Sequence, residues 1–351
     1  MKFLQESVCI PLAFFLLLLA TNSVVATEKV DRFRQRPGER FQRFRQLRNQ
    51  EKSRPGSAET DDSSRFERIQ KFRNLHQKMQ TQTSGSVPEH ADISYGNHER
   101  QKMDIYTPDN PKHLPVMIYV HGGAWSFGNK RMVETKPDYF ISKNWIFVSI
   151  NYRLLPDGRH PENVKDIASA LAWIYQNIAQ YGGCPEKIFL SGFSAGAHLA
   201  ALVALDESYL AATGHNPSII KSVVLLDNPV SDVTTEVLGE SRDRLLRAFG
   251  SDENTHKNAS PVYHVAKSSN SPAFIMAYSG GMPSNSPMSA KDFKLQAVSL
   301  GQALNHSGIK NYISCFEQLN HSQLNRGFGC LKDEHGVTDW IMKHLKQLTA
   351  K

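Results

Sequence analysis

The sequence predicts an α/β fold in which a mostly parallel sheet carries helices on both faces. Short apolar runs alternate with longer helical patterns over residues 91–351. Such alternation implies crossover helices that cover both faces of a parallel sheet. A serine also stands at a glycine-flanked junction between a strand pattern and a helix pattern. Active sites of these sheets lie beyond the carboxyl ends of the strands, so the same pattern predicts an enzyme.

Periodicity and composition place the elements in order. Strands are expected at 103–106, 116–120, 146–150, 187–191, 222–226, 273–278 and 312–316. Helices are expected at 163–180, 195–205, about 289–307 and 338–348. Asp166, near the start of the first helix, is expected to anchor the loop around Arg153.

The first 90 residues differ in character from the rest of the chain. Residues 1–26 predict a secretory signal with an apolar stretch at 10–20, which is shorter than a spanning helix needs. An uncleaved N-terminal anchor is the alternative. No later segment of the sequence is long and apolar enough to span a bilayer. We therefore expect a secreted or periplasmic protein.

Residues 27–90 form a basic segment with few aliphatic residues. They contain 15 Lys and Arg against 9 Asp and Glu, a balance of +6 out of a total of +7 for the chain. Such a composition favours a disordered linker or tail. The alternative is a basic strip, including an amphipathic helix over 66–75, that contacts an anionic surface, polysaccharide or nucleic acid through charge. No specific nucleic-acid recognition is expected.

Ser194 is the candidate nucleophile. It stands in Gly192-Phe193-Ser194-Ala195-Gly196, after the strand at 187–191 and before the helix at 195–205. That order is typical of a nucleophile elbow, a sharp turn that exposes the serine hydroxyl.

Two further segments supply the groups that a serine nucleophile requires. His121-Gly122-Gly123 follows the strand at 116–120, and the N–H groups of Gly122, Gly123 and Ala195 are predicted to form an oxyanion hole. His321 follows the last strand and is predicted to be the general base.

The acid that should orient His321 is less clearly marked. Segment 279–287, after the penultimate strand, contains no carboxylate. Asp292 is the first acid beyond it and is favoured, although it could instead complement a helix N-terminus. Asp227 and Asp232, after the strand at 222–226, are the alternatives, and a chain without a working acid is the third.

Metal motifs and cofactor motifs are not found. The sequence has no HExxH and no paired CxxC, so no metal and no cofactor are expected. Of its four cysteines, Cys9 lies in the predicted signal, and Cys315 with Cys330 could form a bridge.

Taken together, these motifs resemble the α/β-hydrolase superfamily over residues 91–348. The branch that they resemble contains hormone-sensitive-lipase-like esterases, kynurenine formamidases and bacterial feruloyl or acetylxylan esterases. The resemblance implies Ser194 as nucleophile, His321 as base, and Gly122, Gly123 and Ala195 as oxyanion donors. The family's Gly-x-x-Asp after the penultimate strand is not matched.

The predicted function is that of an exported serine hydrolase. It would cleave a carboxylic ester, on a small molecule or linked to a polysaccharide, through an acyl-enzyme. The alternatives are a non-catalytic, hydrolase-like binding protein and an arylformamide amidase.

Overall fold

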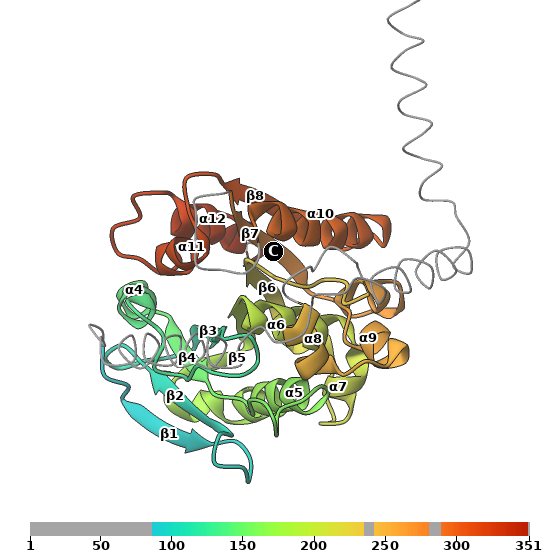
Figure 1. Ribbon diagram of the computed structural model, residues 1–351. Coiled ribbons are helices and arrows are strands. Elements are labelled where there is room, and N and C mark those ends of the chain that lie inside the picture. The colour runs from blue at the N-terminus through green and yellow to red at the C-terminus, as the bar shows by residue number, and fades with distance from the viewer. Residues whose placement is uncertain (1–85, 235–241, 281–288, 350–351) are drawn as a thin grey trace, which may run out of the picture. The chain divides into compact units, whose positions relative to one another are not determined.

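Eight strands form one sheet in the computed structural model, which describes residues 86–234, 242–280 and 289–349 (Figure 1). The strands are β1 (His90–Ser94), β2 (Lys102–Tyr106), β3 (Leu114–Val120), β4 (Ile146–Ile150), β5 (Gly183–Phe193), β6 (Ile220–Leu226), β7 (Ala273–Ser279) and β8 (Asn311–Phe316). Their order across the sheet is β1-β2-β4-β3-β5-β6-β7-β8. Pairing is antiparallel from β1 through β2 to β4 and parallel from β4 to β8. The predicted mostly parallel sheet is confirmed.

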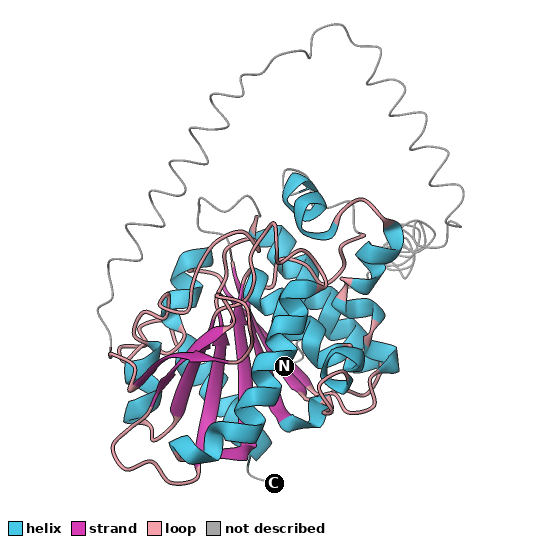
Figure 2. Cartoon of the chain, turned by 90° about the horizontal axis from the view of Figure 1, so that it is seen from below, coloured by secondary structure: helices cyan, strands magenta, loops and turns pink. Residues whose placement is uncertain are grey.

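Helices cover both faces of this sheet (Figure 2). They are α4 (Lys136–Ser142), α5 (Glu162–Asn177), α6 (Ala195–Leu205), α7 (Glu207–Ala211), α8 (Arg242–Phe249), α9 (Glu253–Asn258), α10 (Ala290–His306), α11 (His321–Gly327) and α12 (Val337–Thr349). Side chains of β3 alternate between two buried clusters: Ile118 packs in the cluster that includes α5, α6 and α10, whereas Met117 packs in the one that includes α4 and α12.

All seven predicted strands and all four predicted helices are present, and the differences lie in short or exposed elements. Strand β1 was not predicted, because it is an edge strand without buried residues, and it begins at His90, inside the predicted tail. Helices α4, α7, α8, α9 and α11 have eight residues or fewer. Such lengths give too few turns for a helical period to be recognised.

Several smaller expectations can be compared with the structure. Asp166 accepts hydrogen bonds from the backbone N–H (2.8 Å) and the guanidinium (2.7 Å) of Arg153, so the predicted anchoring of that loop is confirmed. Cys315 and Cys330 are free thiols, and the bridge considered between them is absent. Residues 1–85, with the predicted signal, nearly all of the tail and the 66–75 segment, lie outside the described residues. Within the described ranges, no helix combines the length and apolar character needed to cross a membrane.

Candidate active site

Ser194 occupies a strained turn between β5 and α6. Its φ of 52° and ψ of −124° lie in a region that residues with a side chain rarely adopt. The turn is held by the Ser194 N–H, which donates to the carbonyl of Leu226 at the end of β6 (2.9 Å). The strain is of the kind that a nucleophile elbow needs, because it projects the side chain beyond the carboxyl end of the strand.

Two glycines flank the serine because backbone segments approach each other there. A Cβ on Gly192 would lie 2.3 Å from the carbonyl oxygen of Gly196, and one on Gly196 would lie 2.2 Å from that of Val120. Neither distance is sterically allowed for a side chain. The glycines of the motif therefore let α6 pack tightly against the ends of β3 and β5.

The loop after β3 lies directly beside the serine. A Cβ built on Gly122 would be 3.1 Å from the Cβ of Ser194. Gly123 has a φ of 123°, which glycine alone adopts readily. Ala195, the first residue of α6, has an N–H without an acceptor in the first turn of its own helix. The three predicted oxyanion donors thus belong to two segments that meet at Ser194.

His121 supports this loop and has no place in the proton chemistry. It is fully buried and stacks on Tyr152 with 4.5 Å between ring centroids. Burial lowers the pKa of His121 to about 3, so the ring is neutral near pH 7. The Tyr152 hydroxyl donates to the His121 carbonyl at 3.0 Å, which fixes the start of the glycine loop.

His321 is the first residue of α11 and lies against the elbow. Its ring contacts that of Phe193, the residue before Ser194, with 4.4 Å between centroids. A reciprocal cap precedes it, in which Asn320 and Gln323 each accept the other's backbone N–H at 2.9 Å. The cap and the ring contact together hold the imidazole in one orientation.

Asp227 is the carboxylate that reaches the imidazole. Its Oδ2 lies 2.8 Å from Nδ1 of His321, and the Asp227 side chain is fully buried. The same carboxylate accepts the N–H (2.7 Å) and the hydroxyl (2.8 Å) of Ser279, at the end of β7. Three donors therefore converge on one buried carboxylate, and a donor at Nδ1 leaves Nε2 of His321 as the basic nitrogen.

The preference for Asp292 requires correction, because its carboxylate closes the N-terminal cap of α10 by accepting the N–H and hydroxyl of Ser289, both at 2.8 Å. Helix α10 contributes an apolar ring instead: Phe293 stacks on His321 with 4.9 Å between centroids and 11° between planes. The third candidate, Asp232, accepts the N–H and hydroxyl of Thr234. Both acids are engaged locally.

The position of Asp227 explains why sequence order was a poor guide. Strand β6 lies between β5 and β7 and ends level with them, since Leu226 pairs with Phe193 and with Ala277. An acid directly after β6 therefore stands one strand from Ser194. Its φ of 47° turns the chain at that point. The available signal was an aspartate immediately after a buried strand, a position that Asp227 fills and Asp292 does not.

A buried aromatic group lies under the glycine loop. Trp125, at 3% exposure, packs edge-on against Phe249 of α8 (5.0 Å) and His198 of α6 (5.4 Å). Packing against these two rings accounts for the position of Trp125. Phe193 instead packs against the His321 ring.

Fold and site together define an α/β-hydrolase of the esterase and lipase branch. The BD-FAE family model matches residues 103–280, and the chain belongs to that family. Esterase B from Lactobacillus rhamnosis has a similar fold, with a TM-score of 0.63 and 19% identity over 82% of this chain and 94% of that one. Esterase 2 from Thermogutta terrifontis gives a TM-score of 0.59 and 22% identity over 75% of this chain and 96% of that one.

Sequence relatives share a shorter segment. Esterase LipQ of Mycobacterium tuberculosis is 42% identical over 136 residues, which are 37% of this chain and 31% of LipQ. Isoprenylcysteine alpha-carbonyl methylesterase ICME of Arabidopsis thaliana is 35% identical over 117 residues, 33% of this chain and 27% of that protein. The chain thus spans about a third or less of the length of these curated relatives.

Proposed function

We propose that this protein is a serine hydrolase that cleaves carboxylic esters with Ser194, His321 and Asp227. The observation that carries the proposal is the 2.8 Å contact between the His321 ring and the buried Asp227 carboxylate, beside a serine held in a strained elbow. Relatives named as esterases and as a carboxylic ester hydrolase support the same reaction class.

The reaction begins with proton transfer from Ser194. The Nδ1–H of His321 donates a hydrogen bond to Asp227 and stays on the ring, so Nε2 accepts the proton of the Ser194 hydroxyl while the oxygen attacks the ester carbonyl. The carbonyl π pair moves onto oxygen and gives a tetrahedral oxyanion. Asp227 stabilises the imidazolium without taking its proton.

Backbone donors stabilise the oxyanion. We expect the N–H groups of Gly123 and Ala195, together with that of Gly122, to donate to the oxygen on which negative charge develops, and one such donor is typically worth about 3 kcal/mol of barrier. When the intermediate collapses, the carbon–oxygen bond to the alcohol breaks and the leaving oxygen takes the proton from His321. Water then repeats the sequence on the acyl-enzyme, which releases the acid and restores Ser194.

The Asp227 contact also bears on the alternatives. The carboxylate-free segment after β7 was the reason to consider a non-catalytic binding protein. A buried acid on the imidazole removes that reason, so we favour catalysis. We propose an ester of a small molecule or of a polysaccharide as substrate, with no specific nucleic-acid partner.

Export of the protein remains a proposal from residues 1–26, and contact with an anionic surface remains one from residues 27–90. N-terminal sequencing of the mature protein tests the first, because a start near residue 27 is expected after cleavage. Salt-sensitive retention on an anionic matrix, compared with a chain lacking residues 27–85, tests the second.

Turnover of p-nitrophenyl acetate tests the catalytic proposal. Ser194→Ala should lower kcat by several orders of magnitude, because the triad acts as a unit. A fluorophosphonate probe should label the unaltered protein and fail to label this variant. Ser251→Ala, which alters an exposed serine, is the matched control and should retain full rate and labelling. Unchanged turnover in Ser194→Ala would end the proposal.

A further inference from the structure

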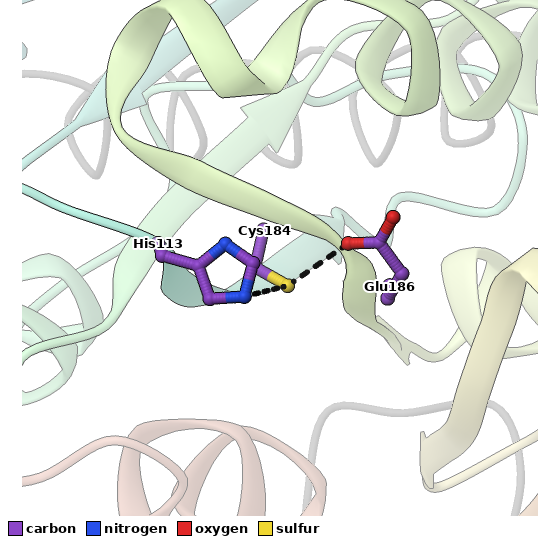
Figure 3. Close-up of side chains that lie close together, drawn as sticks. All are labelled: His113, Cys184 and Glu186. Carbon is purple, nitrogen blue, oxygen red and sulfur yellow. Dashed lines mark hydrogen bonds between the residues drawn. The ribbon is translucent and has the colours of Figure 1, made fainter.

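A second group of reactive side chains lies at the other end of the sheet from Ser194. Figure 3 shows the Sγ of Cys184 between the imidazole ring of His113 and the carboxylate of Glu186. The sulfur is 3.3 Å from Nε2 of His113 and 3.2 Å from Oε2 of Glu186. All three donor atoms lie within 4.8 Å of one another. His113 and Cys184 are separated by 71 residues in the sequence, whereas Cys184 and Glu186 are two residues apart.

The backbone holds two of these residues in place. His113 precedes β3 and Cys184 is the second residue of β5. The N–H of Leu114 donates to the carbonyl of Gly182 at 3.0 Å, which ties the two segments together. Gly182 has a φ of 79°, and a Cβ there would lie 2.3 Å from the carbonyl oxygen of Pro111. This close approach fixes the distance between the imidazole and the thiol.

Exposure differs among the three side chains. Cys184 is fully buried, whereas His113 and Glu186 are exposed. A solute can therefore approach from the side of the imidazole and the carboxylate.

The donor set has the chemistry of a zinc site. Zinc takes thiolate, imidazole and carboxylate ligands at about 2.0–2.3 Å in tetrahedral geometry, which puts the sulfur about 3.5 Å from each of the other two donor atoms. The observed separations from sulfur, 3.3 and 3.2 Å, are close to that value. We propose that His113, Cys184 and Glu186 bind one zinc-class divalent cation, with water as the fourth ligand.

Charge and position indicate what the cation does. A thiolate and a carboxylate carry two negative charges, which balance a divalent ion, and the proton of the thiol leaves for solvent when the metal binds. The site joins the amino ends of β3 and β5. Ser194 follows the far end of β5, whose 11 residues span about 35 Å. The cation would thus clamp the two strands that carry the glycine loop and the elbow, without contact with substrate.

Cobalt titration of the full chain tests this proposal, because thiolate-bound Co²⁺ gives a charge-transfer absorption band. After treatment with a chelator, the protein should show this band with one equivalent of Co²⁺, and Zn²⁺ should abolish it by displacement. Cys184→Ser should lack the band. His113→Gln and Glu186→Gln, at exposed positions, should weaken binding by about tenfold or more, since each removes one of three protein ligands.

Matched controls separate this site from adventitious binding. Cys330→Ser and His306→Gln alter a thiol and an exposed imidazole outside the cluster, and both should titrate like the unaltered protein. Zn²⁺ should raise the melting temperature of the unaltered protein and of these controls, and raise that of the cluster variants by less at the same zinc concentration. The proposal would be overturned if the titration gave no thiolate band, or if His113→Gln and Glu186→Gln bound the metal as tightly as the unaltered protein. Both outcomes can be measured even if Cys184→Ser fails to fold.

Discussion

Replacing Asp227 with asparagine should remove most of the activity while leaving the fold intact. Asparagine has nearly the shape of aspartate, but one of its two terminal atoms donates. The Ser279 N–H is a fixed donor, 2.7 Å from Oδ1, and it retains the asparagine oxygen. The amide nitrogen then faces Nδ1 of His321, which must become an acceptor.

The magnitude follows from this change of tautomer. With its proton on Nε2, the imidazole cannot take the proton of Ser194. The same exchange in a serine triad lowers kcat by about 10⁴, which corresponds to about 5.5 kcal/mol of barrier. We expect a loss of this size in Asp227→Asn.

Asp292→Asn is the matched comparison. Its carboxylate contacts only Ser289 among the described hydrogen-bond partners, so turnover should stay within about twofold and stability should fall by about 0.5 kcal/mol, through the lost charge at the start of α10.

Initial rates on p-nitrophenyl acetate measure the activity of both variants, and thermal unfolding measures their stability. The assignment of the acid would be refuted if Asp227→Asn kept full activity, or if Asp292→Asn lost more activity than Asp227→Asn.

Three further outcomes concern stability. Gly123→Ala should unfold at lower temperature and lose activity, because the new Cβ would lie 2.0 Å from the carbonyl oxygen of Phe127; melting and turnover measure both effects. Asp166→Ala should cost about 3 kcal/mol of unfolding free energy in urea titrations, since it strips a buried partner from Arg153. Stability should also fall as pH drops from about 6.5 to about 4, because burial lowers the pKa of certain histidines in the folded state only, so the unfolded chain binds more protons across that window. Each such histidine contributes at most about 1.4 kcal/mol of unfolding free energy per pH unit. Urea unfolding midpoints measured across this pH window test the expectation, and midpoints that do not change with pH would contradict it. These histidines, with pKa values of about 3, 4 and 4, are His121, His160 and His198.

Contacts between distant segments were beyond the reach of sequence patterns. The three donors of the proposed metal site carry no short motif, because His113 meets Cys184 only when β3 and β5 pair. Likewise, the cap of α10 occupies Asp292 through a local hydrogen bond that competes with any distant role. In the first case the pairing of strands decided which side chains meet, and in the second case a local helix cap did.

By itself, the sequence determined the parallel sheet, its covering helices and the candidate pair Ser194 and His321. Those features depend on local causes: apolar periodicity, a glycine-flanked turn, and the position of a histidine after the last strand. Only the tertiary structure decided which carboxylate serves the imidazole. Asp227 reaches His321 because β6 lies beside β5 and ends level with it, a relation across 94 residues that no local pattern encodes.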